Sequence, residues 1–150
     1  MGGRRRTDYA RLTDMADVFT KRKRAELMAR IRSRGNKDTE LTLAAFFHEH
    51  SLIGWRRGWP LLGKPDFVFA RMKLAVFVDG CFWHGCHRHG RIPTSNRQYW
   101  FNKIARNKKR DRTVSRTLRR SGWRVLRIWE HELAPKNSTR LLQRMRKALR

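Results

Sequence analysis

Acidic residues are scarce in this 150-residue chain, and their scarcity is the first clue to its partners. Lys and Arg number 37 against 12 Asp and Glu, which gives a formal net charge of +25. A chain so short of negative charge repels itself and suits a polyanionic partner such as nucleic acid. Long apolar runs are also missing, since no stretch approaches the ~20 residues needed to cross a bilayer. We therefore expect a cytoplasmic protein that acts on DNA, not on a membrane.

Cysteine is scarce as well, with Cys81 and Cys86 as the only two in the chain. Together with the lack of an apolar secretory signal, this predicts a reducing compartment and no disulfide framework. The length predicts one domain with a sizeable core. Residues 1–23 are polar and basic without an apolar period, so we expect a flexible arm that orders on DNA. Residues 24–150 are expected to form the domain.

The apolar pattern predicts an α/β fold. Helices are expected at residues 24–34, 38–50 and 97–120 and near the C-terminus, and strands at 54–59, 67–70, 74–78 and 123–129. This order predicts an α/β/α sandwich around a mixed central sheet. The 97–120 helix should begin at a cap within Thr94-Ser95-Asn96. Its expected inner face consists of Tyr99, Trp100, Ile104, Val114 and Leu118.

Two aspartates flank the two central strands. Asp66 opens the first strand after Pro65, and Asp79 closes the second before Gly80. In an antiparallel pair, both carboxylates lie at the same end of the sheet. Hard cations such as Mg²⁺ bind one or two carboxylates together with water and phosphate oxygens. The alternative is that both are turn residues that satisfy loop backbone, but two such acids in an acid-poor chain favour a Mg²⁺ site.

The loop after Asp79 has the composition of a zinc site. Cys81 and Cys86 are followed by His87 and His89, and either histidine gives a spacing compatible with tetrahedral zinc. His131 follows the last strand and is the best candidate for the fourth ligand. We favour His89 over His87, and a structural zinc over the alternatives of a disulfide or two free core thiols.

Three motifs carry a resemblance to a known family. They are Pro-Asp-Phe-Val, Val-Phe-Val-Asp-Gly-Cys-Phe-Trp-His-Gly-Cys, and Gly-Trp-Arg-Val-Leu-Arg-Ile-Trp-Glu-His-Glu-Leu. Over residues 24–133 the chain resembles the very-short-patch mismatch-repair endonucleases (Vsr), a branch of the restriction-endonuclease-like PD-(D/E)xK nucleases. The resemblance implies a restriction-endonuclease-like fold and a Mg²⁺-dependent nick. That nick falls beside the thymine of a T:G mismatch, which arises when 5-methylcytosine is deaminated.

The resemblance also implies catalytic roles. The (D/E)xK lysine is absent after Asp79, and His84 stands where the Vsr branch has a histidine instead. His84 would be the general base, supported by Asp111, while Asp66 holds the metal and Glu40 supports its water shell. From the residues alone, Glu40 could serve the helix dipole, Asp111 could be a surface counter-charge, and His84 could be a zinc ligand.

DNA contacts are expected from three groups of residues. Phe82 and Trp83 would insert beside the mismatch, although buried core is the more frequent fate of such aromatics. Met28 could be a wedge by resemblance, or an ordinary core methionine. The basic face of the 97–120 helix should contact phosphates, because almost no acid is interspersed among its cations; this face includes Lys103, Arg106 and Arg110.

The first hypothesis is thus a monomeric mismatch-nicking endonuclease, with possible coupling to other repair proteins. A second is a nicking nuclease associated with a restriction-modification system. A third is a zinc-stabilised DNA-binding module without catalysis. The acid pair separates the third from the others, because carboxylates facing phosphate would only repel it in a pure binder.

Overall fold

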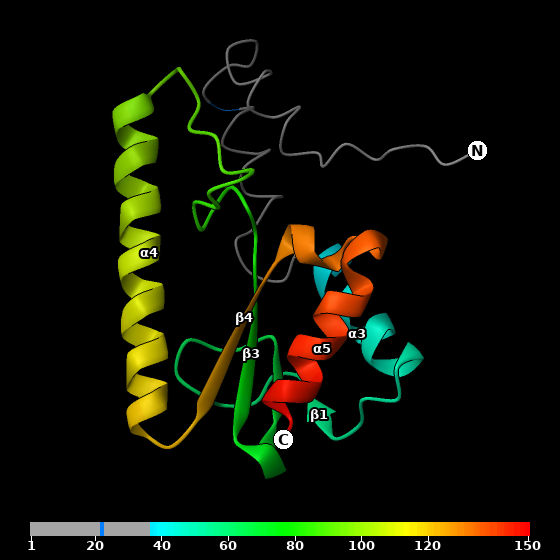
Figure 1. Cartoon of the computed structure of the whole chain (residues 1–150). Helices are drawn as coiled ribbons and strands as arrows, with labels where there is room; N and C mark the ends of the chain where they lie inside the picture. Colours follow the sequence, from blue (N-terminus) through cyan, green and yellow to red (C-terminus); the bar gives the residue numbers. More distant parts are fainter. Residues whose placement is uncertain (1–21, 23–36) are drawn as a thin grey trace, which may run out of the picture.

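The computed structural model describes Arg22 and residues 37–150 (Figure 1). The helices of the domain are α3 (Lys37–Glu49), α4 (Arg97–Arg120) and α5 (Ser138–Ala148). The strands are β1 (Trp55–Arg56), β2 (Phe67–Phe69), β3 (Leu74–Asp79) and β4 (Arg124–Trp129). Short 3₁₀ segments lie at η1 (Ala70–Met72), η2 (Glu130–Leu133) and η3 (Pro135–Asn137).

The four strands form one mixed sheet in the order β1-β2-β3-β4. β1 and β2 pair antiparallel, as do β2 and β3, in which Phe67 lies opposite Val76. β3 and β4 are parallel, with Asp79 opposite Trp129. A parallel pair needs a long crossover, and α4 provides it. The ends of β3 and β4 therefore reach the same edge of the sheet, where the predicted site residues follow them.

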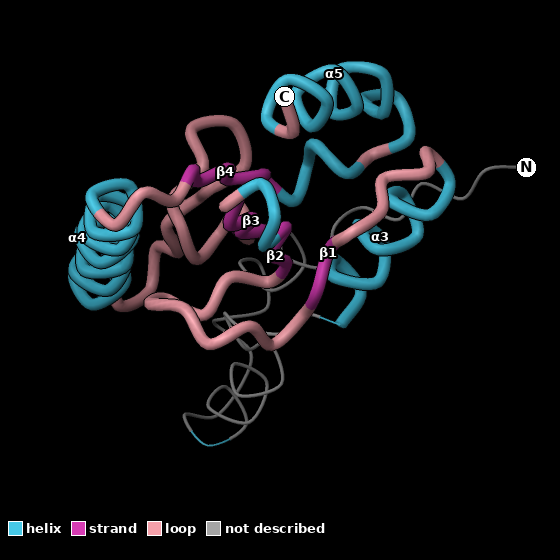
Figure 2. The backbone as a smooth tube through the Cα atoms, turned by 90° about the horizontal axis from the view of Figure 1, so that it is seen from below, coloured by secondary structure: helices cyan, strands magenta, loops and turns pink. Residues whose placement is uncertain are grey.

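Helices cover both faces of the sheet. Viewed along the sheet, α4 lies on one side, and α3 and α5 lie on the other (Figure 2). The larger core joins Phe47 of α3 and Leu141 of α5 to Phe67, Val76 and other sheet residues. The smaller core joins Ala75 and Phe77 of β3 to Val114 and Leu118 of α4. The predicted α/β/α sandwich with a mixed central sheet is confirmed.

Three details of the fold differ from the sequence prediction. β1 has two residues instead of the six expected, because Gly54 and Gly58 adopt φ of 89° and 66°, outside extended backbone. α4 begins and ends as predicted, but Asn96 has a left-handed φ of 53° and makes no side-chain cap hydrogen bond. Tyr99, expected on the inner face of α4, is 52% exposed.

Several predictions fall outside the described residues. The helix at 24–34 with Met28 lies there, as does the arm at 1–23 apart from Arg22. In the part of the chain that the structure describes, no helix is both long and apolar enough to cross a membrane.

Candidate active site and metal centre

Three of the four predicted catalytic residues, Asp66, His84 and Asp111, line one hollow at the carboxyl end of β3. The hollow has a volume of about 220 Å³. The segment before β2, β3, the loop after β3, α4 and β4 each contribute to its wall. Among its lining residues are Lys64, Asp66, Asp79, His84, Asp111 and Arg127.

Asp66 sits in this hollow among other acids. Its Oδ2 accepts a hydrogen bond of 2.7 Å from the backbone N–H of Val78, which fixes the carboxylate against β3. The pKa of Asp66 is raised from 3.8 to about 6, first by burial and then by the nearby charges of Glu40 and Asp79, while the Val78 hydrogen bond acts in the opposite direction. A cation bound to this carboxylate would relieve both the burial and the repulsion. Asp66 therefore fits a divalent metal.

Glu40 approaches the same place from α3. Its side chain is buried and forms an ion pair with Arg57, just after β1. It also interacts with Asp66 by charge and by a hydrogen bond. The position beside Asp66 agrees with a supporting role at a metal, and helix-dipole complementarity alone does not explain the contact. The Arg57 partner was missed by the sequence analysis, because Arg57 lies in a predicted strand among many arginines.

Asp79 has a different environment from Asp66. Arg127 Nη1 lies 2.7 Å from Asp79 Oδ1, and His84 Nδ1 lies 3.7 Å from the same oxygen. Asp79 thus shares the hollow with Asp66, as the sequence predicts, but one of its oxygens is already held by an arginine. Each acid thus has one oxygen left for a cation, but Arg127 already balances the charge of Asp79, whereas Asp66 is repelled by Glu40 and Asp79, so Asp66 fits a metal better. Arg127 was also missed by the sequence analysis.

His84 and Asp111 form the closest polar contact in the hollow. His84 Nδ1 lies 2.5 Å from Asp111 Oδ2, and both side chains are largely buried. Burial alone would raise the pKa of Asp111, but the hydrogen bond with His84 and the charges of Arg127 and Arg110 lower it. Asp111 is therefore an ionised partner of the imidazole and not a free surface counter-charge. Since Nδ1 faces Asp111, only Nε2 is left to exchange a proton with a substrate.

The loop that carries His84 is held tightly against α4. Asn107 donates a 2.9 Å hydrogen bond to the carbonyl of Trp83, one helical turn before Asp111. Gly85 has a φ of 63°, and a Cβ at this position would lie 2.5 Å from Cε of Lys108. Glycine therefore permits the close approach of loop and helix that brings His84 to Asp111.

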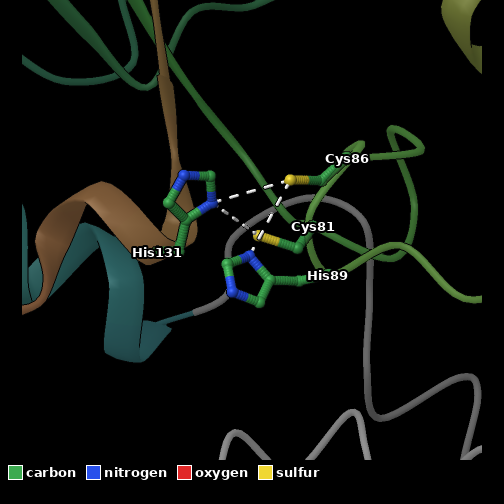
Figure 3. Close-up of side chains that lie close together, drawn as sticks. All are labelled: Cys81, Cys86, His89 and His131. Carbon is green, nitrogen blue, oxygen red and sulfur yellow. Dashed lines mark hydrogen bonds between the residues drawn. The ribbon is translucent and has the colours of Figure 1, made fainter.

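The four predicted zinc ligands also lie together. The ligand atoms of Cys81, Cys86, His89 and His131 are all within 4.8 Å of one another. His131, from the 3₁₀ segment after β4, faces the loop that carries the other three (Figure 3). His87 is exposed and is not part of this cluster, which agrees with the preference for His89.

The spacing within the cluster matches a tetrahedral ion. His131 Nδ1 lies 3.3 Å from Cys81 Sγ and 3.6 Å from Cys86 Sγ, and Cys86 Sγ lies 3.9 Å from His89 Nδ1. Ligands at about 2.3 Å (S) and 2.0 Å (N) from zinc would have such separations. Burial lowers the pKa of His131, which favours the neutral imidazole that a metal binds. The donor set therefore fits zinc.

The aromatic residues of the loop are not exposed. Phe82 and Trp83 are 5% and 4% exposed and pack with Trp100 of α4, with ring centroids 5.4 and 6.0 Å from Trp100. We expected an exposed wedge, and this expectation of exposure is wrong for the structure without DNA. The reason is that Trp100, on the inner face of α4, packs against both rings. The insertion itself stays a prediction.

The basic residues predicted to contact DNA lie on α4. Lys103 Nζ is 5.2 Å from the centre of the Trp83 ring and 5.7 Å from those of Tyr99 and Trp100. Arg106 and Arg110 are exposed, and Arg110 lines the hollow. Lys103 thus lies beside the aromatic cluster of Phe82, Trp83 and Trp100, and Arg110 lies beside the acids of the hollow.

Known proteins resemble this chain over much of its length. Residues 16–89 match the family model described as DNA mismatch endonuclease Vsr. The Type II nicking enzyme V.NmeDIP of Neisseria meningitidis serogroup C is 39% identical over 137 residues, 89% of this chain and 90% of that protein. The DNA mismatch endonuclease Vsr of Escherichia coli K12 is 36% identical, over 77% of this chain and 74% of that protein.

A shorter match has higher identity. The Type II nicking enzyme V.NaeI of Lentzea aerocolonigenes is 62% identical over 69 residues, but these cover only 46% of this chain and 42% of that protein. The longer relatives show that the similarity extends over the domain. The chain therefore belongs to the Vsr family of DNA mismatch endonucleases, has their restriction-endonuclease-like fold, and is a DNA endonuclease.

Proposed function

We propose that this endonuclease nicks one strand of duplex DNA beside the thymine of a T:G mismatch, in a Mg²⁺-dependent reaction. The observation that carries the proposal is the 2.5 Å contact of His84 with Asp111 in the same hollow as Asp66. An oriented imidazole beside a buried carboxylate is what phosphodiester hydrolysis needs. The imidazole removes a proton from water, and the carboxylate holds the ion that neutralises the phosphate.

Asp66 would hold the magnesium, with Glu40 supporting the water around it and Asp79 contributing through Oδ2. A bound Mg²⁺ would supply charge neutralisation at the phosphate and acidify water. The raised pKa of Asp66, about 6, supports this assignment, since a divalent cation would restore the ionised form.

His84 would act through Nε2. With Nδ1–H donated to Asp111, the lone pair of Nε2 is directed away from the helix and can accept the proton of the attacking water. The water oxygen then bonds to phosphorus as the phosphodiester P–O bond breaks. General-base help of this kind is typically worth ~10²–10⁴ in rate.

The Cys81, Cys86, His89 and His131 cluster would hold a structural zinc. Three of the ligands are within nine residues, and His84 lies between the two cysteines. Zinc would therefore fix the base as well as the loop. Residues 24–150 would act as one monomeric domain, with residues 1–23 as a basic arm on DNA.

Recognition of the mismatch would involve Phe82 and Trp83 leaving their cluster and entering the base stack, with Met28 as a second wedge. The buried Nε1 of Trp83 has no hydrogen-bond partner among the described residues. An unpaired buried N–H costs about 1–3 kcal/mol, which lowers the cost of moving the ring. A wobble T:G pair also lowers the cost of unstacking. Lys103, Arg106 and Arg110 would bind the flanking phosphates.

A second candidate concerns the sequence around the mismatch. Two relatives bear the name Type II nicking enzyme, which favours a link to a restriction-modification system. In that case, the enzyme would nick mismatches only within the recognition sequence of that system. Membership of an endonuclease family decides against the non-catalytic binding module.

A nicking assay tests the proposal. Duplexes that differ only in a T:G or T:A pair would be incubated with wild type, His84→Ala and His87→Ala, with and without Mg²⁺. We expect nicks beside the thymine of T:G only, with Mg²⁺ only. His84→Ala should be at least ~10²-fold slower, whereas the exposed His87 should be replaceable. Equal cleavage of T:A, or full activity of His84→Ala with normal zinc content, would contradict the proposal. Varying the flanking bases separates the two candidates.

A further inference from the structure

Arg127 is the most completely bonded arginine of the active-site hollow. It pairs with Phe77 across the parallel strands, so its side chain points to the face of the sheet that α4 covers. The side chain is 24% exposed, and its guanidinium lies 4.5 Å from the centre of the Phe77 ring. The residue therefore lies between β3, β4 and α4, in the wall of the hollow that also carries the acids.

Each nitrogen of the Arg127 guanidinium has its own partner. Nη1 lies 2.7 Å from Asp79 Oδ1 on β3, and Nε lies 3.1 Å from Ser115 Oγ on α4. Nη2 lies 3.4 Å from the backbone carbonyl of Asp111 and 3.6 Å from its Oδ1. The planar fork thus ties one sheet carboxylate to one helix carboxylate at fixed distances.

Both carboxylates that Arg127 contacts also contact His84. Asp111 Oδ2 lies 2.5 Å and Asp79 Oδ1 lies 3.7 Å from His84 Nδ1. Arg127 therefore holds both acids beside the imidazole: it contacts Asp111 through Oδ1, the oxygen not bonded to His84, and Asp79 through the same Oδ1 that faces His84. Without it, two buried anions would compete for a single imidazole N–H, and α4 could shift relative to β3.

We infer that Arg127 is a positioning residue for the nicking reaction, which holds Asp79 and Asp111 so that the imidazole of His84 is directed at the scissile phosphate. The inference rests on the proposed function, because it acts through His84. The plain alternative is that Arg127 only packs α4 onto the sheet. The positioning role and the packing role predict different results for Arg127→Lys, because a lysine ammonium can supply the charge but not three hydrogen bonds in fixed directions.

The chain offers a matched control in Arg144 of α5. Its guanidinium pairs with the carboxylate of Glu132 and donates a 2.9 Å hydrogen bond to the carbonyl of Arg127. Arg144 thus also joins a helix to β4 through one carboxylate and one carbonyl, but it does not line the hollow. Arg144→Lys should cost stability in the same way as Arg127→Lys, without affecting the active-site acids.

The experiment compares single-turnover nicking of a T:G duplex, duplex affinity and melting temperature for wild type, Arg127→Lys, Arg127→Met and Arg144→Lys. We expect nicking to fall ~10-fold in Arg127→Lys and ~10²-fold in Arg127→Met, the cost of misplacing a reacting group by about 1 Å. Affinity should hold, since the guanidinium is occupied by the protein itself. Arg144→Lys should keep the wild-type rate at a similar melting temperature to Arg127→Lys.

A readout independent of cleavage is the His84 Nδ1–H resonance in ¹⁵N-labelled protein. It should be protected in wild type and in Arg144→Lys, and should exchange rapidly in Arg127→Met. Wild-type nicking by Arg127→Lys, or an equal loss in Arg144→Lys, would overturn the inference. His84→Ala separates a failure of this inference from a failure of the proposed function. If His84→Ala nicks slowly while Arg127→Lys nicks at the wild-type rate, only the inference fails. If His84→Ala is fast, the proposed base fails and the inference fails with it.

Discussion

The acid hollow and the cysteine-histidine cluster lie at the same edge of the sheet, yet they are built in opposite ways. In the cluster, two thiols and two imidazoles place their four donor atoms within 4.8 Å of one another. In the hollow, Asp66 is buried beside Glu40 and Asp79, and its pKa is raised to about 6. The cluster has the geometry of a closed, structural metal site. In the hollow, by contrast, the carboxylate of Asp66 is repelled by neighbouring acids and faces an open cavity. Sites that must exchange ligands keep such an open position.

The largest expected difference between the two sites concerns cleavage. Asp66→Ala should abolish Mg²⁺-dependent nicking, because the other acids that line the hollow, Asp79 and Asp111, already pair with Arg127. Its zinc content should remain equal to that of wild type, since Asp66 does not contact the cluster. The check is a nicking assay alongside metal analysis of the same preparation. Residual Mg²⁺-dependent nicking by Asp66→Ala would assign the metal to Asp79 instead.

The cluster should respond in the opposite way. Cys86→Ser should lose zinc and melt early, because binding of a structural zinc contributes directly to folding free energy, by about 10–16 kcal/mol in small zinc domains. Thermal melting and metal analysis of the purified variant measure both effects. His87→Ala is the control within the same loop and should keep both zinc and melting temperature. Full zinc occupancy in Cys86→Ser would refute the ligand assignment.

Phe82 and Trp83 lie between Cys81 and His84 in the sequence, and Trp83→Ala tests whether these aromatic residues belong to recognition. The variant should lose discrimination between T:G and T:A duplexes more than overall affinity, because the wedge acts only where bases unstack, at a few kcal/mol per step. Binding titrations with both duplexes measure this. A folded variant with unchanged discrimination would show that Trp83 has only the core role that its burial suggests.

The smallest effect should be a stabilisation. The folded-state pKa of Asp66 is raised from 3.8 to about 6, so this group favours folding below about pH 3.8 and loses that contribution as pH rises through about 6. The rise corresponds to at most about 3 kcal/mol. Asp66→Asn should therefore melt a few degrees higher than wild type at pH 7 without magnesium, and the difference should shrink toward pH 4.

A matched control for that measurement is Glu49→Gln, which removes an exposed acid of α3 and should change little. Added Mg²⁺ should stabilise wild type but not Asp66→Asn, since only a protein that binds the ion gains stability from it. A lower melting temperature for Asp66→Asn at pH 7 would show that the carboxylate is not under repulsion.

Much of the hollow could be predicted because its acids occupy strand ends in a chain with few acids. Asp66 and Asp79 follow from the hairpin pattern, and the cysteines with His131 follow from spacing and strand order. The roles of His84, Glu40 and Asp111 came from family resemblance, not from periodicity. The structure brings these residues to the expected places.

The rest depended on tertiary packing. Arg127 and Arg57 could not be identified, because Lys and Arg together number 37 and only the packed fold shows which of them point inward. The burial of Phe82 and Trp83 depends on Trp100, 17 positions further along from Trp83 and placed by the direction of α4. The short β1 depends on two glycine conformations that the sequence permits but does not require.

The crossover through α4 has a practical consequence for labelling. The turn at Ser121 and Gly122 lies at the end of α4 opposite to the loop that follows β3 (Figure 1). Ser121 is exposed, and no atom lies within 4 Å of a Cβ added at Gly122. A fluorophore attached through Ser121→Cys would thus be remote from the active-site hollow. The two native thiols are both buried, so a thiol reagent should react first with the new, exposed thiol. Such a probe would report tumbling of the enzyme on DNA in real time.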